Sequence, residues 1–105
     1  MTNANEAAIE AEIKSKGKTA PRITPAMIDD KISERAFLRH GVLTICILTL
    51  WNGFTVTGES ACASPENYDE EIGQKIAFEN ARQKIWPLEG YLLKSMAELN
   101  RLQGV

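Results

Sequence analysis

The sequence predicts a mainly helical α+β fold: a short N-terminal helix, a long helix, a small antiparallel β-hairpin and a kinked pair of C-terminal helices. Three observations lead to this prediction. Apolar residues recur at helical spacing in several segments, a β-branched apolar run precedes Asn52-Gly53, and Pro87 interrupts the last helical pattern.

The first predicted helix covers residues 5–16, which are rich in Ala, Glu, Ile and Lys. Ile9 and Ile13 lie one turn apart on the same face, and Gly17 ends the helix. Residues 17–23 then form a loop with several basic side chains in it or beside it. The first helix is therefore amphipathic and short.

The second predicted helix runs from about residue 25 to residue 39. Thr24 is a favourable N-cap, and Pro25 suits the first helical position, where no amide hydrogen is needed. Gly41 would end the helix. Its buried stripe would consist of Met27, Ile28, Ile32, Ala36 and Phe37.

The hairpin is predicted from two apolar, β-branched runs, residues 42–50 and 54–57, on either side of Asn52-Gly53. Asn-Gly in this setting favours a two-residue type I′ turn. Such a turn pairs Thr49 with Val56, and a shift of one residue would turn every inward side chain outward. The inward set would be Ile45, Ile47, Thr49, Trp51, Phe54, Val56, Gly58 and Ser60.

Ser64-Pro65 repeats the pattern of a capping hydroxyl followed by proline, and predicts a helix from residue 65 to about residue 86. Its core-facing residues would be Ile72, Ile76, Ala77, Ala81 and Ile85. Gly73, Ala77 and Ala81 form a stripe of small residues that would let another helix approach closely. After the kink at Pro87, the last helix is apolar over a wide arc, which predicts a subunit interface.

Length and charge restrict the class of protein. The chain has 105 residues, enough for one domain spanning residues 1–105, with disorder expected at 1–4 and 103–105. The net charge of −2 argues against a duplex-DNA binder. The longest apolar run, residues 42–51, is about half the length of a membrane-spanning helix, so no membrane association is expected. Two cysteines without a secretory signal predict free thiols in a reducing cytoplasm.

No catalytic motif is present. His40 is the only histidine, and nothing in the sequence places a base beside Cys46 or a metal-binding set around Cys62. The clustered carboxylates of residues 66–71 are neighbours in sequence and would splay around a helix start rather than converge on a metal ion. We therefore expect a binding protein, not an enzyme, with no cofactor and no metal.

The basic loop offers one candidate binding site. Lys16, Lys18 and Arg22 surround Thr24 at a predicted helix N-terminus. Amide groups, a hydroxyl and a guanidinium together can bind an anion. From the residues alone, a solvated loop beside an ordinary helix cap is the favoured interpretation.

Several motifs resemble one family of small bacteriophage proteins, first catalogued without function from coliphage and Shigella-phage genomes. These motifs are Asn52-Gly53-Phe54-Thr55-Val56, Gly58-Glu59-Ser60-Ala61-Cys62-Ala63-Ser64-Pro65-Glu66-Asn67-Tyr68, Glu71-Ile72-Gly73 and Ile85-Trp86-Pro87-Leu88-Glu89-Gly90-Tyr91. Upstream, Arg22-Ile23-Thr24-Pro25 is similar to the basic, apolar, Thr-Pro start of that family's long helix.

Members of this family, or of one closely similar to it, are counter-defence proteins. They sequester the cyclic di- and trinucleotides that bacterial CBASS immunity uses as alarm signals, without chemistry on the ligand. The resemblance implies a homo-oligomer, a hexamer, with pockets between protomers, in the cytoplasm of the infected bacterium. It implies a cyclic trinucleotide such as cyclic triadenylate more strongly than a cyclic dinucleotide such as cyclic GMP–AMP.

The resemblance also implies the binding residues. Arg22 and Thr24 would contact phosphate, with Lys18 beside them. Residues at the end of the second hairpin strand would help to form the trinucleotide pocket, and apolar residues of the first helix would pack on a base where other members use an aromatic. These further positions are Glu59, Ser60, Ala61, Ile9 and Ile13. Glu59 stands where some members carry an arginine. The alternative function is a protein-interaction module that inhibits or adapts a host protein through the acidic helix and the apolar tail.

Overall fold

The computed structural model describes residues 4–18 and 20–104, so the disorder expected at 1–3 and 105 lies outside the described residues. The chain forms two compact units, one from residues 31–86 and one from the segments on either side of it. Ala4 already belongs to the first helix, and Gly104 closes a hydrogen-bonded turn after the last. The prediction of a single domain stays a prediction.

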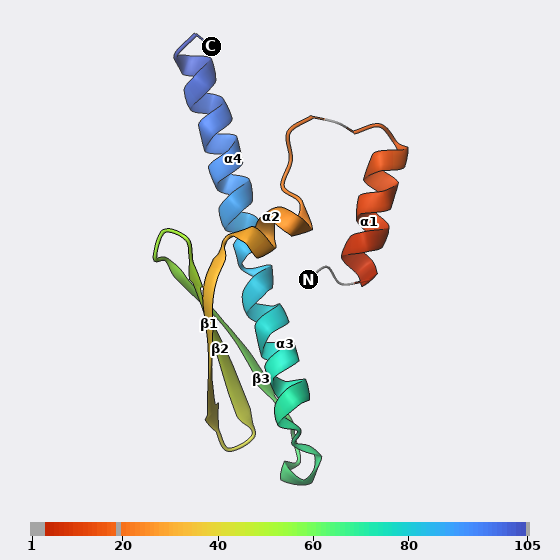
Figure 1. Cartoon of the computed structure of the whole chain (residues 1–105), viewed down its shortest axis with the longest axis vertical. Coiled ribbons are helices and arrows are strands. Elements are labelled where there is room, and N and C mark those ends of the chain that lie inside the picture. Colours follow the sequence, from red (N-terminus) through yellow and green to blue (C-terminus); the bar gives the residue numbers. More distant parts are fainter. Residues whose placement is uncertain (1–3, 19, 105) are drawn as a thin grey trace. The chain divides into compact units, whose positions relative to one another are not determined.

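The 31–86 unit is an antiparallel sheet with one helix packed on it (Figure 1). Its three strands lie side by side in the order β1 (Ile32–His40), β2 (Leu43–Leu50) and β3 (Thr55–Ala61), with β1 and β3 as the outer strands. Helix α3 (Glu70–Gln83) packs against β2 and β3. The α+β class is confirmed, but the sheet has one strand more than the predicted hairpin.

The predicted helix over residues 25–39 is wrong beyond its first turns. Helix α2 (Pro25–Asp30) begins where expected, and the Thr24 hydroxyl accepts a hydrogen bond from the Met27 amide at 3.3 Å. Of the predicted buried stripe, only Ile28 is fully buried. The cap was therefore recognised correctly, whereas the length of the helix was not.

The remaining residues of that predicted helix form β1 because a tight turn places them beside the apolar strand β2. His40 pairs with Leu43 across a two-residue turn whose first residue, Gly41, has a φ of 59°. Glycine at this position suits a type II′ turn, which matches the twist of the flanking strands. Pairing with β2 then outweighs the weak helical spacing of apolar residues, since local propensity is easily overridden by tertiary contacts.

Strand β1 packs two arginines on aromatic rings. The Arg39 guanidinium carbon lies 3.9 Å from the centroid of the Tyr68 ring, and that of Arg35 lies 4.7 Å from the Phe78 ring. A guanidinium over an aromatic face gains cation–π attraction while its aliphatic stem covers apolar surface. The Arg39 Nε also donates to the Gly41 carbonyl at 2.9 Å, which ties the strand to its turn.

The hairpin between β2 and β3 does not have the predicted two-residue turn. The Gly53 amide donates to the Leu50 carbonyl at 2.9 Å, and the Leu50 amide donates to the Phe54 carbonyl at 2.8 Å. Gly53 has a φ of 89°, whereas no described non-glycine residue, Asn52 included, has a positive φ. A type I′ turn needs positive φ at both central residues, so the loop is instead a three-residue connection with glycine at its last position.

This extra loop residue shifts the register by one. Leu48, rather than Thr49, pairs with Val56, so β2 turns the opposite face toward α3 from the one predicted, whereas β3 keeps Val56 and Gly58 inward as predicted. The buried inward residues of the two strands are Thr44, Cys46, Leu48, Leu50, Val56 and Gly58. Ile45 and Ile47 lie half-buried on the other face.

Helix α3 approaches β3 very closely at Gly58. A Cβ atom added to Gly58 would lie 2.1 Å from the Ala81 amide nitrogen and 2.4 Å from the Ala77 carbonyl oxygen. The stripe of Gly73, Ala77 and Ala81 is buried as predicted, but it faces the sheet and not another helix. Two residues of the predicted core face, Ile72 and Ile76, are instead exposed.

The start of α3 also differs from the prediction. Ser64-Pro65 begins only a short 3₁₀ turn, η1 (Pro65–Asn67), and the Ser64 side chain makes no capping hydrogen bond. Asp69 is the actual N-cap, because its Oδ1 accepts from the Ile72 amide at 2.9 Å. Asp69 therefore caps the helix, and Glu70 and Glu71 lie in its first turn, where carboxylates favour the helix dipole.

Asp69→Ala should lower the free energy of unfolding of the 31–86 unit by about 1 kcal/mol, the usual contribution of an N-cap. Ser64→Ala is the matched control and should change it by less than about 0.5 kcal/mol, because Ser64 caps nothing. Urea unfolding followed by tryptophan fluorescence measures both. A larger loss for Ser64→Ala would contradict this assignment of the cap.

The second unit contains α1 (Ala4–Ser15), α2 and most of α4 (Ile85–Leu102). Gly17, with a φ of 67°, ends α1 as predicted, and no residue of α1 is buried. Helix α4 begins two residues before Pro87, so the predicted restart is confirmed. The exposed apolar residues of α4 are Leu88, Tyr91, Leu92, Met96, Leu99 and Leu102. Within the described residues, no helix is both long and apolar enough to span a bilayer.

Candidate functional site

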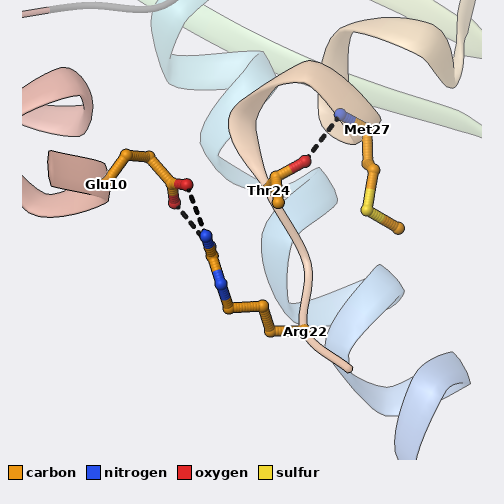
Figure 2. Close-up of polar contacts among 4 residues, drawn as sticks. All are labelled: Glu10, Arg22, Thr24 and Met27. Carbon is orange, nitrogen blue, oxygen red and sulfur yellow. Dashed lines mark hydrogen bonds and ion pairs between the residues drawn. The ribbon is translucent and has the colours of Figure 1, made fainter. Parts of the chain in front are cut away.

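The candidate site is built around Arg22, which extends from the loop before α2 to the side chain of Glu10 on α1 (Figure 2). Its Nη1 donates to Glu10 Oε1 at 2.7 Å, and its Nη2 donates to Oε2 at 2.8 Å. The two side chains are 27% and 20% exposed, so the pair is largely shielded by neighbouring groups. Two parallel charge-assisted hydrogen bonds are the strongest geometry that a guanidinium and a carboxylate can adopt.

Each partner stabilises the charged form of the other. The hydrogen bond from Arg22 lowers the pKa of the Glu10 carboxyl, and nearby Lys14 acts in the same direction. In turn, the hydrogen bond to Glu10 raises the pKa of Arg22. Both groups are therefore ionised at neutral pH, and Arg22 is a guanidinium already occupied by an anion.

Thr24 completes this part of the site. Its hydroxyl oxygen accepts from the Met27 amide, as Figure 2 shows, and its carbonyl accepts from the Ile28 amide at 3.2 Å. A hydroxyl that accepts one hydrogen bond keeps its own hydrogen to donate. The cap thus fixes the position of Thr24 while leaving it a donor for an anionic oxygen.

The other predicted residues of this unit surround the loop more loosely. Lys18 is exposed, and Lys16 pairs with Glu12 at 3.6 Å on the exposed side of α1. Ile9 is 49% exposed and Ile13 is half-buried.

Ser60 and Ala61 line a cavity of about 100 Å³ in the 31–86 unit. The cavity is enclosed by the turn after β1, the end of β3, η1 and the start of α3, and Tyr68 and Gly73 contribute to its wall. Tyr68 Oη is buried and makes no hydrogen bond within the described residues. A cavity of this volume is large enough for a small part of a ligand.

Glu59 is exposed at the same end of β3 and does not line this cavity. The Asn80 side chain donates to its carbonyl at 2.8 Å, and Thr57 Oγ1 donates to its carboxylate at 3.4 Å. Arg22 and Thr24 belong to one compact unit, and Glu59, Ser60 and Ala61 belong to the other. The predicted residues therefore form two groups, one in each unit.

Sequence reasoning missed Glu10 and Tyr68. Glu10 lies twelve residues before Arg22 on an exposed helix, where glutamate is common, so no local pattern identifies it as the partner of Arg22. Tyr68 immediately precedes the capping residue Asp69. Its ring contacts Arg39 of strand β1, and the sequence did not predict that strand. A bidentate pair between distant residues can be found only from the fold.

The two cysteines lie in different environments. Burial raises the pKa of the Cys46 thiol, and the Cys62 thiol donates to the Ser64 carbonyl at 3.4 Å. Both cysteines are free, as predicted. Across residues 4–18 and 20–104, no group of three or more His, Cys, Asp or Glu side chains is arranged to hold a metal ion.

Comparison with known proteins gives one match. Residues 23–97 match the sequence model of a phage protein family, described as the N4 Gp49/phage Sf6 gene 66 family. No curated protein matches the chain. No solved structure matches it either.

Proposed function

This chain belongs to the phage protein (N4 Gp49/phage Sf6 gene 66) family, and we propose that it binds and sequesters cyclic di- and trinucleotides in the infected bacterium, without catalysis. Removal of these second messengers would block host CBASS immunity. Cyclic triadenylate is the ligand favoured first and cyclic GMP–AMP second. The cytoplasm of the host is the compartment in which such messengers are made.

The observation that carries this proposal is the geometry of Arg22. Its guanidinium already holds a planar, two-oxygen anion through both terminal nitrogens, which is the arrangement in which arginine binds a phosphodiester. Thr24, two residues later, keeps a hydroxyl hydrogen for a second phosphate oxygen. The same two positions match the phosphate-binding residues implied by the family resemblance.

The net charge of −2 is compatible with this ligand class. Duplex binding depends on many phosphate contacts and a basic surface, whereas a cyclic oligonucleotide has only two or three phosphates. A few local donors and apolar side chains such as those of Ile9 and Ile13 are enough to bind it. The proposal includes self-association into a hexamer through the exposed apolar side of α4, with light-scattering mass as its test.

Arg22→Ala should weaken binding of cyclic triadenylate by about 100-fold, because it removes a bidentate, charge-assisted contact. Arg101→Ala is the matched control: Arg101 is also paired with a glutamate, Glu98, but lies at the far end of α4. It should leave the affinity unchanged. Isothermal titration calorimetry with both nucleotides measures the effect, and chromatography should recover the nucleotide intact.

Nucleotide binding to the wild-type protein decides whether the proposal holds. If neither cyclic triadenylate nor cyclic GMP–AMP binds at micromolar concentration to the folded protein, sequestration is wrong for this chain. Linearised nucleotide after incubation would instead indicate a hydrolase.

A protein-interaction module is the second candidate, favoured by the exposed apolar residues along α4. Contiguous exposed apolar surface commonly marks a protein-binding site. Purification from host lysate with one stoichiometric host protein and no retained nucleotide would support this candidate over the first.

A further inference from the structure

We propose that Glu10 occupies the ligand's phosphate position in the free protein, and that a phosphate-bearing ligand binds Arg22 by displacing this carboxylate. The inference rests on the proposed function, because it identifies an internal competitor at the same site. It comes from the ion pair in which each terminal nitrogen of Arg22 is bonded to a different oxygen of Glu10 (Figure 2).

The two anions compete because they use the same donors. A carboxylate and a phosphodiester both offer two oxygens that fit the guanidinium fork. A second anion could reach only the remaining edge of Arg22, next to a carboxylate of the same charge. Exchange of Glu10 for phosphate is therefore favoured over binding of both.

Glu10 thereby determines what kind of ligand can enter. A neutral group or a single hydrogen-bond acceptor does not replace two charge-assisted hydrogen bonds, whereas a phosphodiester does. Glu10 is thus a specificity-determining residue, because any ligand of Arg22 must bind strongly enough to displace its carboxylate. The protein can bind the ligand only while Arg22 is released from Glu10, and this state is only partly populated. The apparent affinity for the ligand is therefore lower than it would be if Arg22 were always unoccupied.

The exchange also affects α1. No residue of α1 is buried, so the pair between Glu10 and Arg22 is an important tie between α1 and the loop before α2. When phosphate takes Arg22, this tie is lost. The remaining contacts of α1, together with any contact that the helix makes with the ligand, then set its position relative to the loop.

The first test compares affinities. Glu10→Gln should bind cyclic triadenylate roughly fivefold to tenfold more tightly than the wild type, since the competing charge is gone. Glu12→Gln makes the same change in net charge on the same helix, but Glu12 pairs with exposed Lys16. Its affinity should change by less than about twofold. Calorimetry on the full chain measures all three proteins.

The second test follows Glu10 in the unmodified protein. Carbon-13 NMR of the side-chain carboxyl should give a pKa below the ordinary range of glutamate in the free protein. Cyclic triadenylate should raise it most of the way back, with Lys14 still lowering it somewhat. A pKa that stays low in the complex overturns the exchange.

Inorganic phosphate separates this inference from the proposed function. If no cyclic nucleotide binds but phosphate raises the pKa of Glu10 more than chloride at equal ionic strength, sequestration is wrong and exchange at Arg22 stands. If the nucleotide binds and Glu10→Gln does not bind it more tightly, sequestration stands and the exchange is wrong. If no cyclic nucleotide binds and phosphate leaves the pKa of Glu10 unchanged, both are wrong.

Discussion

Gly58→Ala should destabilise the 31–86 unit by about 3 kcal/mol, at the upper end of the usual cost of overpacking. The added Cβ would lie 2.1 Å from a backbone nitrogen and 2.4 Å from a backbone oxygen of α3. Backbone atoms in a helix cannot move aside as the end of a flexible side chain can. Helix α3 would have to separate from β3 along the stripe of Ala77 and Ala81 that packs there.

Gly90→Ala is the control for this substitution. Gly90 lies in the part of α4 outside the 31–86 unit, with nothing within 4 Å of an added Cβ, so alanine there should not lower the free energy of unfolding of the 31–86 unit. Urea unfolding followed by the fluorescence of Trp51 and Trp86 reports on the 31–86 unit, which contains both tryptophans. A Gly58→Ala protein as stable as the wild type would show that α3 does not pack on β3 in this way.

Leu48→Ala should lower the free energy of unfolding of the same unit by about 3 kcal/mol, because it leaves a cavity under α3. Its neighbour Ile47 is half-buried on the other face of the sheet, and Ile47→Ala should cost about 1 kcal/mol. This pair tests the register directly. The register predicted from a two-residue turn would reverse the order of the two effects.

Features encoded by a few neighbouring residues could be predicted from the sequence. The stop at Gly17, the cap at Thr24, the hairpin at Asn52-Gly53 and the restart near Pro87 depend on backbone preferences of single residues, which act in the same way in any fold. The stripe of small residues on the buried side of α3 was also recognisable. The element that packs on this stripe was not, because small residues at this spacing permit close approach by either a helix or a strand.

Features decided by distant residues could not be predicted in this way. Residues 32–40 have helical spacing, but pairing with β2 is available only once the turn at Gly41 has formed. The register of β2 and β3 depended on whether Asn52 adopts positive φ, and the sequence is compatible with either loop. In the candidate site, Arg22 and Thr24 were identified from their residue types, whereas Glu10 became visible only from the fold.

Strand β1 has a further consequence, for solubility. It is an outer strand of the sheet, and an unprotected outer strand can add a strand from another molecule and start aggregation. Glu34, Arg35 and Arg39 place three charges on it, and two of these lie over aromatic rings. Under the proposed function, sequestration without turnover would need about one binding site for each ligand molecule, and therefore a high protein concentration. Charges on β1 oppose growth of the sheet from one molecule into the next at such a concentration.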